Sequence, residues 1–244
     1  MNKKTLSALL GALVAINTYA STYVENEDNK IEEKENSIIE LIERAKKVIN
    51  SYEEDNTKQV INFGYLKNDS NIYDYLDSCN NISLIDKFQK VVIYNEINGY
   101  YFVETENNTC GYINKNNIEI LPNLFVEVDI SSQIVNLFKD NELIMTTPCV
   151  TGHATKHSTR IGYFSIQYKQ KDTYLRGPGY SSYVNYWMPF DGGIGLHDAD
   201  RWRSTYGGDI YITNGSHGCV NMPHDAAETV FNTVSSGTRV LVHK

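Results

Sequence analysis

The 244-residue sequence lacks several features that would assign it to a functional class directly. Basic residues are in the minority, with 22 Lys and Arg against 30 Asp and Glu and a formal net charge of −8. Because affinity for phosphates needs a cationic surface, this balance argues against nucleic-acid binding. There is no C-x-x-C pair and no H-E-x-x-H motif, the usual marks of structural and catalytic zinc sites. No internal repeat or low-complexity tract is present.

Proline and cysteine are also scarce, with five Pro and four Cys. Eighteen Tyr favour strands, since aromatic rings suit the half-buried face of a sheet. The cysteines are Cys79, Cys110, Cys149 and Cys219. Cys79 and Cys110 could pair in an oxidising compartment or remain free thiols, and their spacing leaves both outcomes open. A hydrophobic fraction of 41% over this length is enough for one or two folded domains.

Residues 1–20 have the organisation of a signal peptide or a membrane anchor. Lysines at 3–4 precede a short apolar stretch at 6–16, and residues 18–20 put small side chains at the positions that a signal peptidase inspects. The apolar stretch is shorter than the roughly 20 residues that span a membrane, and no other segment is long and apolar enough. We therefore expect an exported protein, which contacts the membrane only if this segment stays as an uncleaved anchor.

Residues 21–57 are predicted to form a charged linker followed by an amphipathic helix. The linker, Glu25–Lys34, has little to bury. Apolar residues then recur at helical spacing. They are Ile38, Leu41, Ile42, Ala45, Val48 and Ile49. The helix is expected to pack on a neighbouring domain or on another copy of the chain, and the sequence does not determine the oligomeric state.

Residues 58–121 show a different pattern, of short strands separated by turns that contain Asn and Gly. Strands are predicted at Val91–Tyr94 and within two further stretches, Asn98–Val103 and Thr109–Ile113. These two stretches resemble the last strands of bacterial Src-homology-3-like domains, which often accompany cell-wall enzymes. The resemblance implies a small β-barrel, and an unrelated barrel of the same size would give the same pattern.

Pro122 marks the start of a second predicted domain that runs to residue 244. Two stretches, Leu124–Ile130 and Gln133–Phe138, alternate in polarity around a pair of serines, as in a β-hairpin. A single amphipathic helix is predicted between His224 and Val234, and residues 240–242 form a final strand. This domain is therefore expected to be mainly β, with one or two helices.

Cys219 is the first candidate for chemistry, because it follows a glycine at a turn. A nucleophilic cysteine needs an exposed position and a lowered thiol pKa. Gly218 lets a substrate backbone approach closely, and the amides of Gly218 and Cys219 would face a developing oxyanion. Pro223 suggests that a helix begins shortly afterwards, and a helix N-terminus near the sulfur would favour the thiolate.

Two histidines are candidate bases for the thiol proton. His217 lies two residues before Cys219, so on an extended segment both side chains share one face. His197 follows a glycine-rich approach at residues 192–196, and either imidazole can accept the proton. Asp198 would orient His197 through its carboxylate or its backbone carbonyl. Spacing alone favours His217, and either histidine remains open as the base.

The same residues carry a specific family resemblance. His197 followed by Ser216-His217-Gly218-Cys219-Val220-Asn221 is similar to the signature of L,D-transpeptidases with a YkuD-type catalytic domain. Thr151-Gly152 and Thr159–Phe164 resemble a strand and a turn of the same family. The likeness spans Leu121–Lys244, about half of the chain.

Two departures from the family pattern are visible. The loop from His197 to Ser216 is slightly longer than the usual range, which suggests an altered substrate lid around Arg201–Arg203. Arg160 stands where many members have proline. Neither departure removes a catalytic group.

The resemblance implies a β-sandwich or β-barrel catalytic fold and a defined reaction, without a metal or cofactor. Cys219 would attack the carbonyl between the third residue of a peptidoglycan stem tetrapeptide and its terminal D-alanine, release D-alanine and hold the stem as a thioester. The side-chain amine of diaminopimelate on a second stem would resolve the thioester and cross-link the two third residues. The expected partners are therefore donor and acceptor stem peptides, and the expected location is secreted or cell-wall-associated.

The resemblance also distributes roles among the residues. It makes Cys219 the nucleophile and His197, rather than His217, the general base. The oxyanion and substrate pocket would be formed by Ser216, His217, Gly218, Asn221 and Asp198. Contacts with the stem peptide are expected from Tyr180, Tyr186, Arg201, Trp202 and Arg203, although ordinary surface or core roles are equally compatible with the sequence.

Four alternatives remain open. A zinc site could be formed by His197, His217, Cys219 and His224, whose side chains are suitable ligands. Water could resolve the same thioester, which would make the protein an L,D-carboxypeptidase. A sortase-like cysteine transpeptidase would use an arginine at the oxyanion, and Arg239 is the nearest one downstream. A wall-binding module with a degenerate enzyme domain would keep the fold without the activity.

Overall fold

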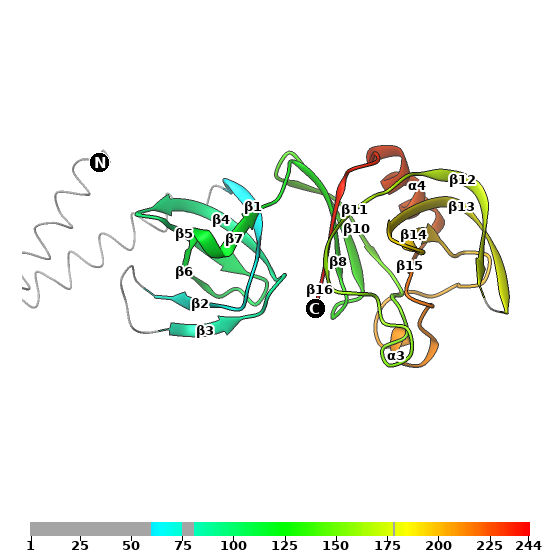
Figure 1. Ribbon diagram of the computed structural model, residues 1–244, viewed down its shortest axis with the longest axis horizontal. Helices are drawn as coiled ribbons and strands as arrows, with labels where there is room; N and C mark the ends of the chain where they lie inside the picture. Colours follow the sequence, from blue (N-terminus) through cyan, green and yellow to red (C-terminus); the bar gives the residue numbers. More distant parts are fainter. Residues whose placement is uncertain (1–59, 75–80, 178) are drawn as a thin grey trace, which may run out of the picture. The chain divides into compact units, whose positions relative to one another are not determined.

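The computed structural model describes residues 60–74, 81–177 and 179–244. The predicted signal segment, linker and amphipathic helix lie outside these ranges, as does Cys79. Residues 60–244 form one compact unit that is mainly β, as predicted, with three sheets (Figure 1). Cys110 carries a free thiol. Within the described ranges, every helix is too short or too polar to cross a membrane.

Sheet A contains seven strands in the order β3-β2-β6-β5-β4-β1-β7. β4 and β5 form a hairpin through Asn98 and Gly99, whose φ angles of 50° and 84° match the twist that a two-residue hairpin turn needs. Alternate side chains such as Val91 and Ile93 enter a core of their own. The bounds are β1 (Asn62–Leu66), β2 (Ser70–Tyr73), β3 (Asn81–Ile85), β4 (Lys90–Ile97), β5 (Tyr100–Thr105), β6 (Cys110–Asn114), the 3-10 helix η1 (Lys115–Asn117) and β7 (Ile118–Ile120).

Sheet A is open, whereas the sequence predicted a small barrel. Closure needs a ladder of hydrogen bonds between the two outermost strands, and in the described residues none joins β3 to β7. The predicted short strands and their Asn- and Gly-containing turns are present. The likeness to Src-homology-3-like domains, and the boundary at residues 121–122, stay predictions.

The remaining strands build two sheets that share one core (Figure 1). Sheet B has the order β10-β9-β8-β16-β11, with β16 parallel to β8, and sheet C has the order β12-β13-β14-β15, with β15 parallel to β14. Neither sheet is closed, so this half is a sandwich and not a barrel. The bounds are β8 (Leu124–Asp129), β9 (Ile134–Lys139), β10 (Glu142–Pro148), β11 (Gly162–Ser165), β12 (Gln170–Gly177), β13 (Tyr180–Asp191), β14 (Ile194–Asp198), α3 (Ile210–Asn214), β15 (Val220–Met222), α4 (His224–Thr233) and β16 (Arg239–His243).

Helix α4 packs against sheet C through the apolar face that the sequence predicted. Ala227, Val230 and Phe231 are its buried residues, and full burial of an aliphatic or aromatic side chain contributes about 1.5–3 kcal/mol relative to exposure. Lys169 Nζ donates to the carbonyls of Phe231 and Val234 at 2.5 and 2.6 Å. A helix leaves its last carbonyls without internal partners, so this lysine stabilises the end of α4.

An aromatic cluster joins sheet A to sheet B. The rings of Phe125 on β8 and Phe138 on β9 stack at 4.7 Å, and Phe63 on β1 lies 4.7 Å from Phe138. Tyr65 on β1 lies 4.6 Å from Tyr163 on β11. The two sheets are therefore connected by a packed apolar contact as well as by the chain itself.

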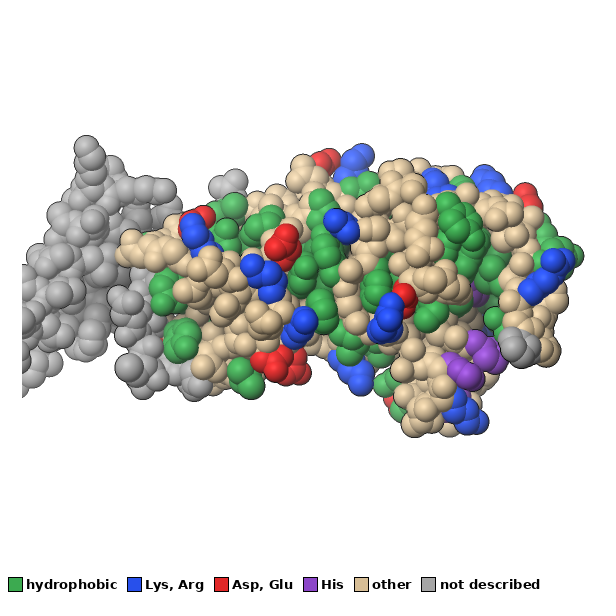
Figure 2. Space-filling model, viewed as in Figure 1, with side chains coloured by type: hydrophobic (Ala, Val, Ile, Leu, Met, Phe, Trp, Pro, Cys, Tyr) green, Lys and Arg blue, Asp and Glu red, His purple; other side chains and the backbone are tan. Residues whose placement is uncertain are grey.

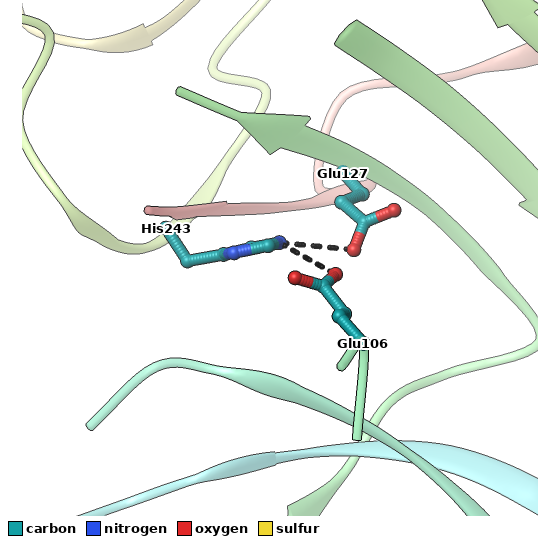
Figure 3. Close-up of side chains that lie close together, drawn as sticks. All are labelled: Glu106, Glu127 and His243. Atoms are coloured by element: carbon teal, nitrogen blue, oxygen red, sulfur yellow. Dashed lines mark hydrogen bonds and ion pairs between the residues drawn. The ribbon is translucent and has the colours of Figure 1, made fainter. Parts of the chain in front are cut away.

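An ionic cluster, defined as Lys90, Glu106, Glu127 and His243, lies in the same junction. Figure 3 draws its two carboxylates and His243, and Glu106 is the exposed member. Glu127 is fully buried, and its Oε1 lies 2.5 Å from Lys90 Nζ and 2.9 Å from His243 Nε2. Glu106 Oε1 lies 3.4 Å from Lys90 Nζ and 3.5 Å from His243 Nε2. Burial disfavours a charged His243, but the hydrogen bond with Glu127 and the nearby negative charges raise its pKa above the usual value. Two cations thus face two carboxylates between the sheets.

Candidate active site

The turn that carries Cys219 is held closed by Ser216. Ser216 Oγ accepts a hydrogen bond from the Gly218 amide at 3.0 Å and donates to the Cys219 carbonyl at 2.5 Å. Gly218 has a φ of 115°, and a Cβ there would lie 3.0 Å from the side chain of Ile194. Only glycine meets both conditions without strain. The local sequence therefore folds into a tight turn that presents Cys219 just before β15.

Only one of the two expected oxyanion amides is available. The Gly218 N–H is bound by Ser216 Oγ. The Cys219 N–H has no hydrogen-bond acceptor among the described residues. The Cys219 amide is therefore the backbone donor that a developing oxyanion would meet.

Parallel pairing of β14 and β15 brings His197 next to this turn. In the register of these strands His197 lies opposite Asn221, two residues after Cys219. His197 is buried, and its Nδ1 lies 2.8 Å from the Asp198 carbonyl. Because a carbonyl can only accept, Nδ1 carries the proton and Nε2 keeps a free lone pair. Burial lowers the pKa of His197, so the ring is neutral at neutral pH and can act as a base.

Asp198 orients His197 through its backbone and not through its side chain. Its carboxylate is buried and accepts from the Asn185 amide, the Asn185 side chain and the Tyr186 amide at 2.7–3.0 Å. These bonds tie the end of β14 to β13. Of the two possibilities that the sequence left open, the backbone carbonyl is therefore the one in contact with the imidazole.

The Cys219 thiol is partly buried, and it is not the preformed thiolate that the sequence favoured. Its Sγ lies 3.7 Å from the Gly193 carbonyl. Burial raises the pKa of the thiol to about 11, and the nearby Gly195 N–H opposes this only in part. The expected help from a helix is absent, because β15 separates Cys219 from α4. A thiol in this state would have to give up its proton to act as a nucleophile.

His217 is exposed and belongs to a column of rings beside the thiol. Its ring stacks on Tyr180 at 5.0 Å and lies 5.0 Å from the ring of His157. Histidine side chains gather on the surface near α3, as Figure 2 shows. The geometry thus separates the two histidines, since His197 is fixed at the cavity floor and His217 forms part of the wall.

The pair lies in a cavity of about 560 Å³. Its walls include the hairpin β12–β13 and the loop that leads to α3. Of the residues predicted from the sequence, the cavity is lined by His197, Ser216, His217, Cys219, Asn221, Tyr180, Trp202 and Arg203. Further lining residues that the sequence did not single out are Tyr168, Gln170, Thr173, Tyr174, Leu175, Arg176, Ser182, Trp187, Gly193, Asn214 and Gly215.

Two predicted substrate contacts lie elsewhere. Tyr186 is buried in the core, where its hydroxyl donates to Glu228 and its ring packs on Phe231. Tyr186 is not among the residues that line the cavity, whereas its neighbour on β13, Trp187, is. The guanidinium of Arg201 lies 4.3 Å from the ring centroid of Tyr183 and is not part of the cavity wall.

The two departures from the family pattern have structural consequences. The long loop after His197 contains α3, and Arg203 Nη2 donates to the Asn214 carbonyl at 2.7 Å across it. Trp202 and Arg203 of this loop form part of the cavity wall, in line with the predicted lid position. Arg160 pairs with Asp191 and lies over the ring of Phe164, so it ties the start of β11 to β13.

The four candidate zinc ligands are not gathered into one site. Among the described residues, two groups bring three potential ligand atoms within 4.8 Å, namely Glu106, Glu127 and His243, and Asp198, Asp200 and His224. Neither contains His197, His217 or Cys219. In the first group the Lys90 ammonium faces both carboxylates, and in the second Asp198 is held by amide N–H groups.

Comparison with known proteins identifies this part of the chain. The profile of the YkuD family, the L,D-transpeptidase catalytic domain, matches residues 123–242. The catalytic domain of an E. faecium L,D-transpeptidase acylated by ertapenem is 40% identical, over 50% of this chain and 98% of that one, with a TM-score of 0.46. A crystal structure of a cysteine-to-serine mutant of Enterococcus faecium L,D-transpeptidase is 25% identical, over 73% of this chain and 76% of that one, with a TM-score of 0.49.

The Ldtfm–avibactam carbamoyl enzyme is 26% identical, over 80% of this chain and 79% of that one, with a TM-score of 0.50. No curated protein matches the sequence. The sandwich with its Cys–His cavity is thus a transpeptidase-type catalytic domain. Residues 123–242 match the YkuD family, the L,D-transpeptidase catalytic domain, over almost the whole sandwich.

Proposed function

We propose that the protein is a peptidoglycan L,D-transpeptidase that uses Cys219 as its nucleophile. The observation that carries the proposal is that Cys219 and His197 line the same cavity, with His197 Nδ1 engaged and Nε2 free. One relative is acylated by ertapenem and another is a carbamoyl enzyme, so reaction with acyl donors is known in the family. The predicted export signal agrees with a secreted or cell-wall-associated enzyme.

In the acylation step, His197 Nε2 takes the thiol proton while Sγ bonds to the carbonyl before the terminal D-alanine. The carbonyl oxygen becomes an oxyanion, which accepts a hydrogen bond from the Cys219 N–H. When the C–N bond breaks, His197 returns the proton to the leaving amine and D-alanine departs. The stem remains on Cys219 as a thioester.

In the second step, the side-chain amine of a diaminopimelate on another stem attacks the thioester. Neutral His197 accepts a proton from that amine, the C–S bond breaks, and the thiol is restored. The cavity wall supplies Arg176 and Arg203 for stem carboxylates, and Tyr180 and Trp202 for apolar contacts. Water attacking the same thioester would give a tripeptide instead of a cross-link.

The test is incubation with a tetrapeptide-stem muropeptide followed by mass spectrometry. We expect a thioester adduct on Cys219 and a product dimer linked through third residues. Cys219→Ala should abolish both. Cys110→Ala removes a free thiol outside the cavity and should leave both unchanged.

Two outcomes would overturn the proposal. A cross-linked dimer formed by Cys219→Ala would exclude the thiol as the nucleophile. Free tripeptide without dimer would mean that the enzyme is an L,D-carboxypeptidase.

A further inference from the structure

The segment from residue 151 to residue 159 packs directly on the turn that carries Cys219. The Ser216 amide donates to the Thr151 carbonyl at 3.0 Å, and the His153 amide donates to the Ser216 carbonyl at 2.9 Å. A Cβ on Gly152 would lie 2.0 Å from the His157 carbonyl oxygen and 2.8 Å from Gly218 Cα. Only a glycine allows backbones to approach this closely, so the two segments are built as one unit.

Thr159 supplies the side-chain link between these segments. It is buried, its Oγ1 accepts from the Gly152 amide at 2.8 Å, and it donates to the Gly218 carbonyl at 2.8 Å. An amide can only donate and a carbonyl can only accept, so the direction of the hydroxyl proton is fixed. The Gly218 carbonyl is therefore held by the Thr159 hydroxyl, which is itself held by the Gly152 amide.

The Gly218 carbonyl shares a planar trans peptide unit with the Cys219 N–H, and the two groups point in opposite directions. Gly218 has no side chain to resist rotation of this unit. A bond that holds the carbonyl on the Thr159 side therefore directs the Cys219 N–H away from Thr159. This is the amide that has no acceptor among the described residues.

We propose that Thr159 is a positioning residue, whose hydroxyl sets the orientation of the Gly218–Cys219 peptide and thereby aims the oxyanion-binding Cys219 amide. The inference rests on the proposed function only in taking Cys219 as the residue that is acylated. Thr159 touches no substrate and acts through the peptide unit. Loss of the Thr159 hydroxyl should therefore slow reactions of Cys219 that develop an oxyanion. It should slow other reactions of the sulfur much less.

Two reactions of Cys219 separate these effects. Acylation by ertapenem forms an S–C bond at the lactam carbonyl, passes through an oxyanion, breaks the lactam C–N bond and moves the thiol proton to the released nitrogen. Alkylation by iodoacetamide forms an S–C bond at a saturated carbon, releases iodide and the thiol proton, and develops no oxyanion. The ratio of the acylation rate to the alkylation rate therefore reports how well the oxyanion is stabilised. Changes in the reactivity of the thiol itself affect both rates and cancel.

Thr159→Val keeps the shape and removes the hydroxyl. We expect it to lower ertapenem acylation roughly 10- to 100-fold, since loss of an oxyanion donor costs about 100- to 1000-fold in kcat, and to change alkylation by less than about threefold. In muropeptide turnover kcat should fall while KM stays within about threefold. Thr159→Ser keeps the hydroxyl and should restore the acylation rate to within about threefold of the wild type.

Thr151→Val is the matched control, because Thr151 is also buried and its Oγ1 accepts from Gln133 Nε2, away from the Gly218 carbonyl. It should leave the ratio of the two rates unchanged. Equal loss of both reactions in Thr159→Val, or an unchanged ratio, would overturn the inference, and so would failure of Thr159→Ser to restore acylation. If Thr159→Val does not fold, Thr159→Ala takes its place, because it also removes the hydroxyl and should lower the ratio of acylation to alkylation in the same way.

The proposed function fails separately, when the wild-type protein forms no dimer from muropeptides. A wild-type protein that is alkylated but not acylated by ertapenem would overturn both.

Discussion

At the scale of single residues, Cys219 and His197 are both uncharged before a substrate arrives. Burial raises the pKa of the thiol to about 11, and burial lowers the pKa of the imidazole. The proton therefore stays on sulfur at rest, and in the proposed mechanism it moves to nitrogen only as the bond to the carbonyl forms. A resting pair of this kind protects the thiol from reagents that meet it without being held in the cavity.

The first prediction concerns the pH dependence of the free thiol. Alkylation of Cys219 by iodoacetamide should keep accelerating from about pH 7 to about pH 10, because the thiolate fraction grows roughly tenfold per pH unit below the pKa. The rate is measured by mass spectrometry of the Cys219 peptide in a Cys110→Ala background. A rate that levels off below about pH 8 would mean that the thiolate is already formed at rest.

At the scale of secondary-structure elements, several strands and helix α4 could be predicted from the sequence. The hairpin β8–β9 alternates in polarity over part of its length, and the apolar face of α4 has helical spacing, so periodicity identified both. Strand β15 was missed, because its three residues are all buried and show no alternation. This omission is the reason that the sequence predicted a helix N-terminus beside Cys219.

The candidate site, like the secondary structure, was predictable only in part. The residue types and the family signature identified Cys219 and His197, and the structure brings them to one cavity. The orientation of Tyr186 was not predictable, because the sequence does not indicate which residues of the long strand β13 meet the core and which meet the cavity. The role of Thr159 was also hidden, since its two partners, Gly152 and Gly218, are distant in sequence or contribute only backbone atoms.

The second prediction tests the packing of α4. Phe231→Ala should lower the free energy of unfolding by about 3–5 kcal/mol, because the buried ring packs on Tyr186 and lies under the Lys169 ammonium. Asn232→Ala, at the next and exposed position, should change it by less than about 0.5 kcal/mol. Urea unfolding followed by circular dichroism measures both. Equal stabilities for the two variants would contradict the packing described for α4.

At the scale of the whole described unit, sheet A and sheet B meet through the aromatic contacts and the ionic cluster. Glu127 accepts from both cations and from the Asn136 side chain, so loss of either cation leaves a buried carboxylate with one charged partner instead of two. Breaking a buried pair in this way typically costs about 3–5 kcal/mol. The junction is therefore expected to unfold together with the catalytic domain.

The third prediction gives this junction a pH dependence. The pKa of His243 is raised in the folded state, so its stabilising contribution is complete below the unfolded pKa and is lost as the pH rises through the folded value. Wild type should exceed His243→Gln in stability by several kcal/mol near pH 6, and the gap should shrink towards pH 9. Urea unfolding across this range measures the gap.

Lys115→Ala is the control for that experiment, because Lys115 pairs with Glu96 at the surface, with both side chains nearly half exposed. Its effect on stability should be small at each pH, because a solvent-exposed ion pair contributes little. A gap between wild type and His243→Gln that does not change with pH would show that His243 contributes through packing and not through charge.

The parallel pairing of β16 with β8 also governs when the catalytic domain can fold during synthesis. Residues 125 and 239 are neighbours in sheet B although more than 100 residues of chain lie between them. When the ribosome has reached residue 230, β8 and β9 have been synthesised. Strand β16, which pairs with β8, has not. Contacts this distant in sequence also slow folding. Sheet B therefore cannot be completed until residues 239–243 have left the ribosome.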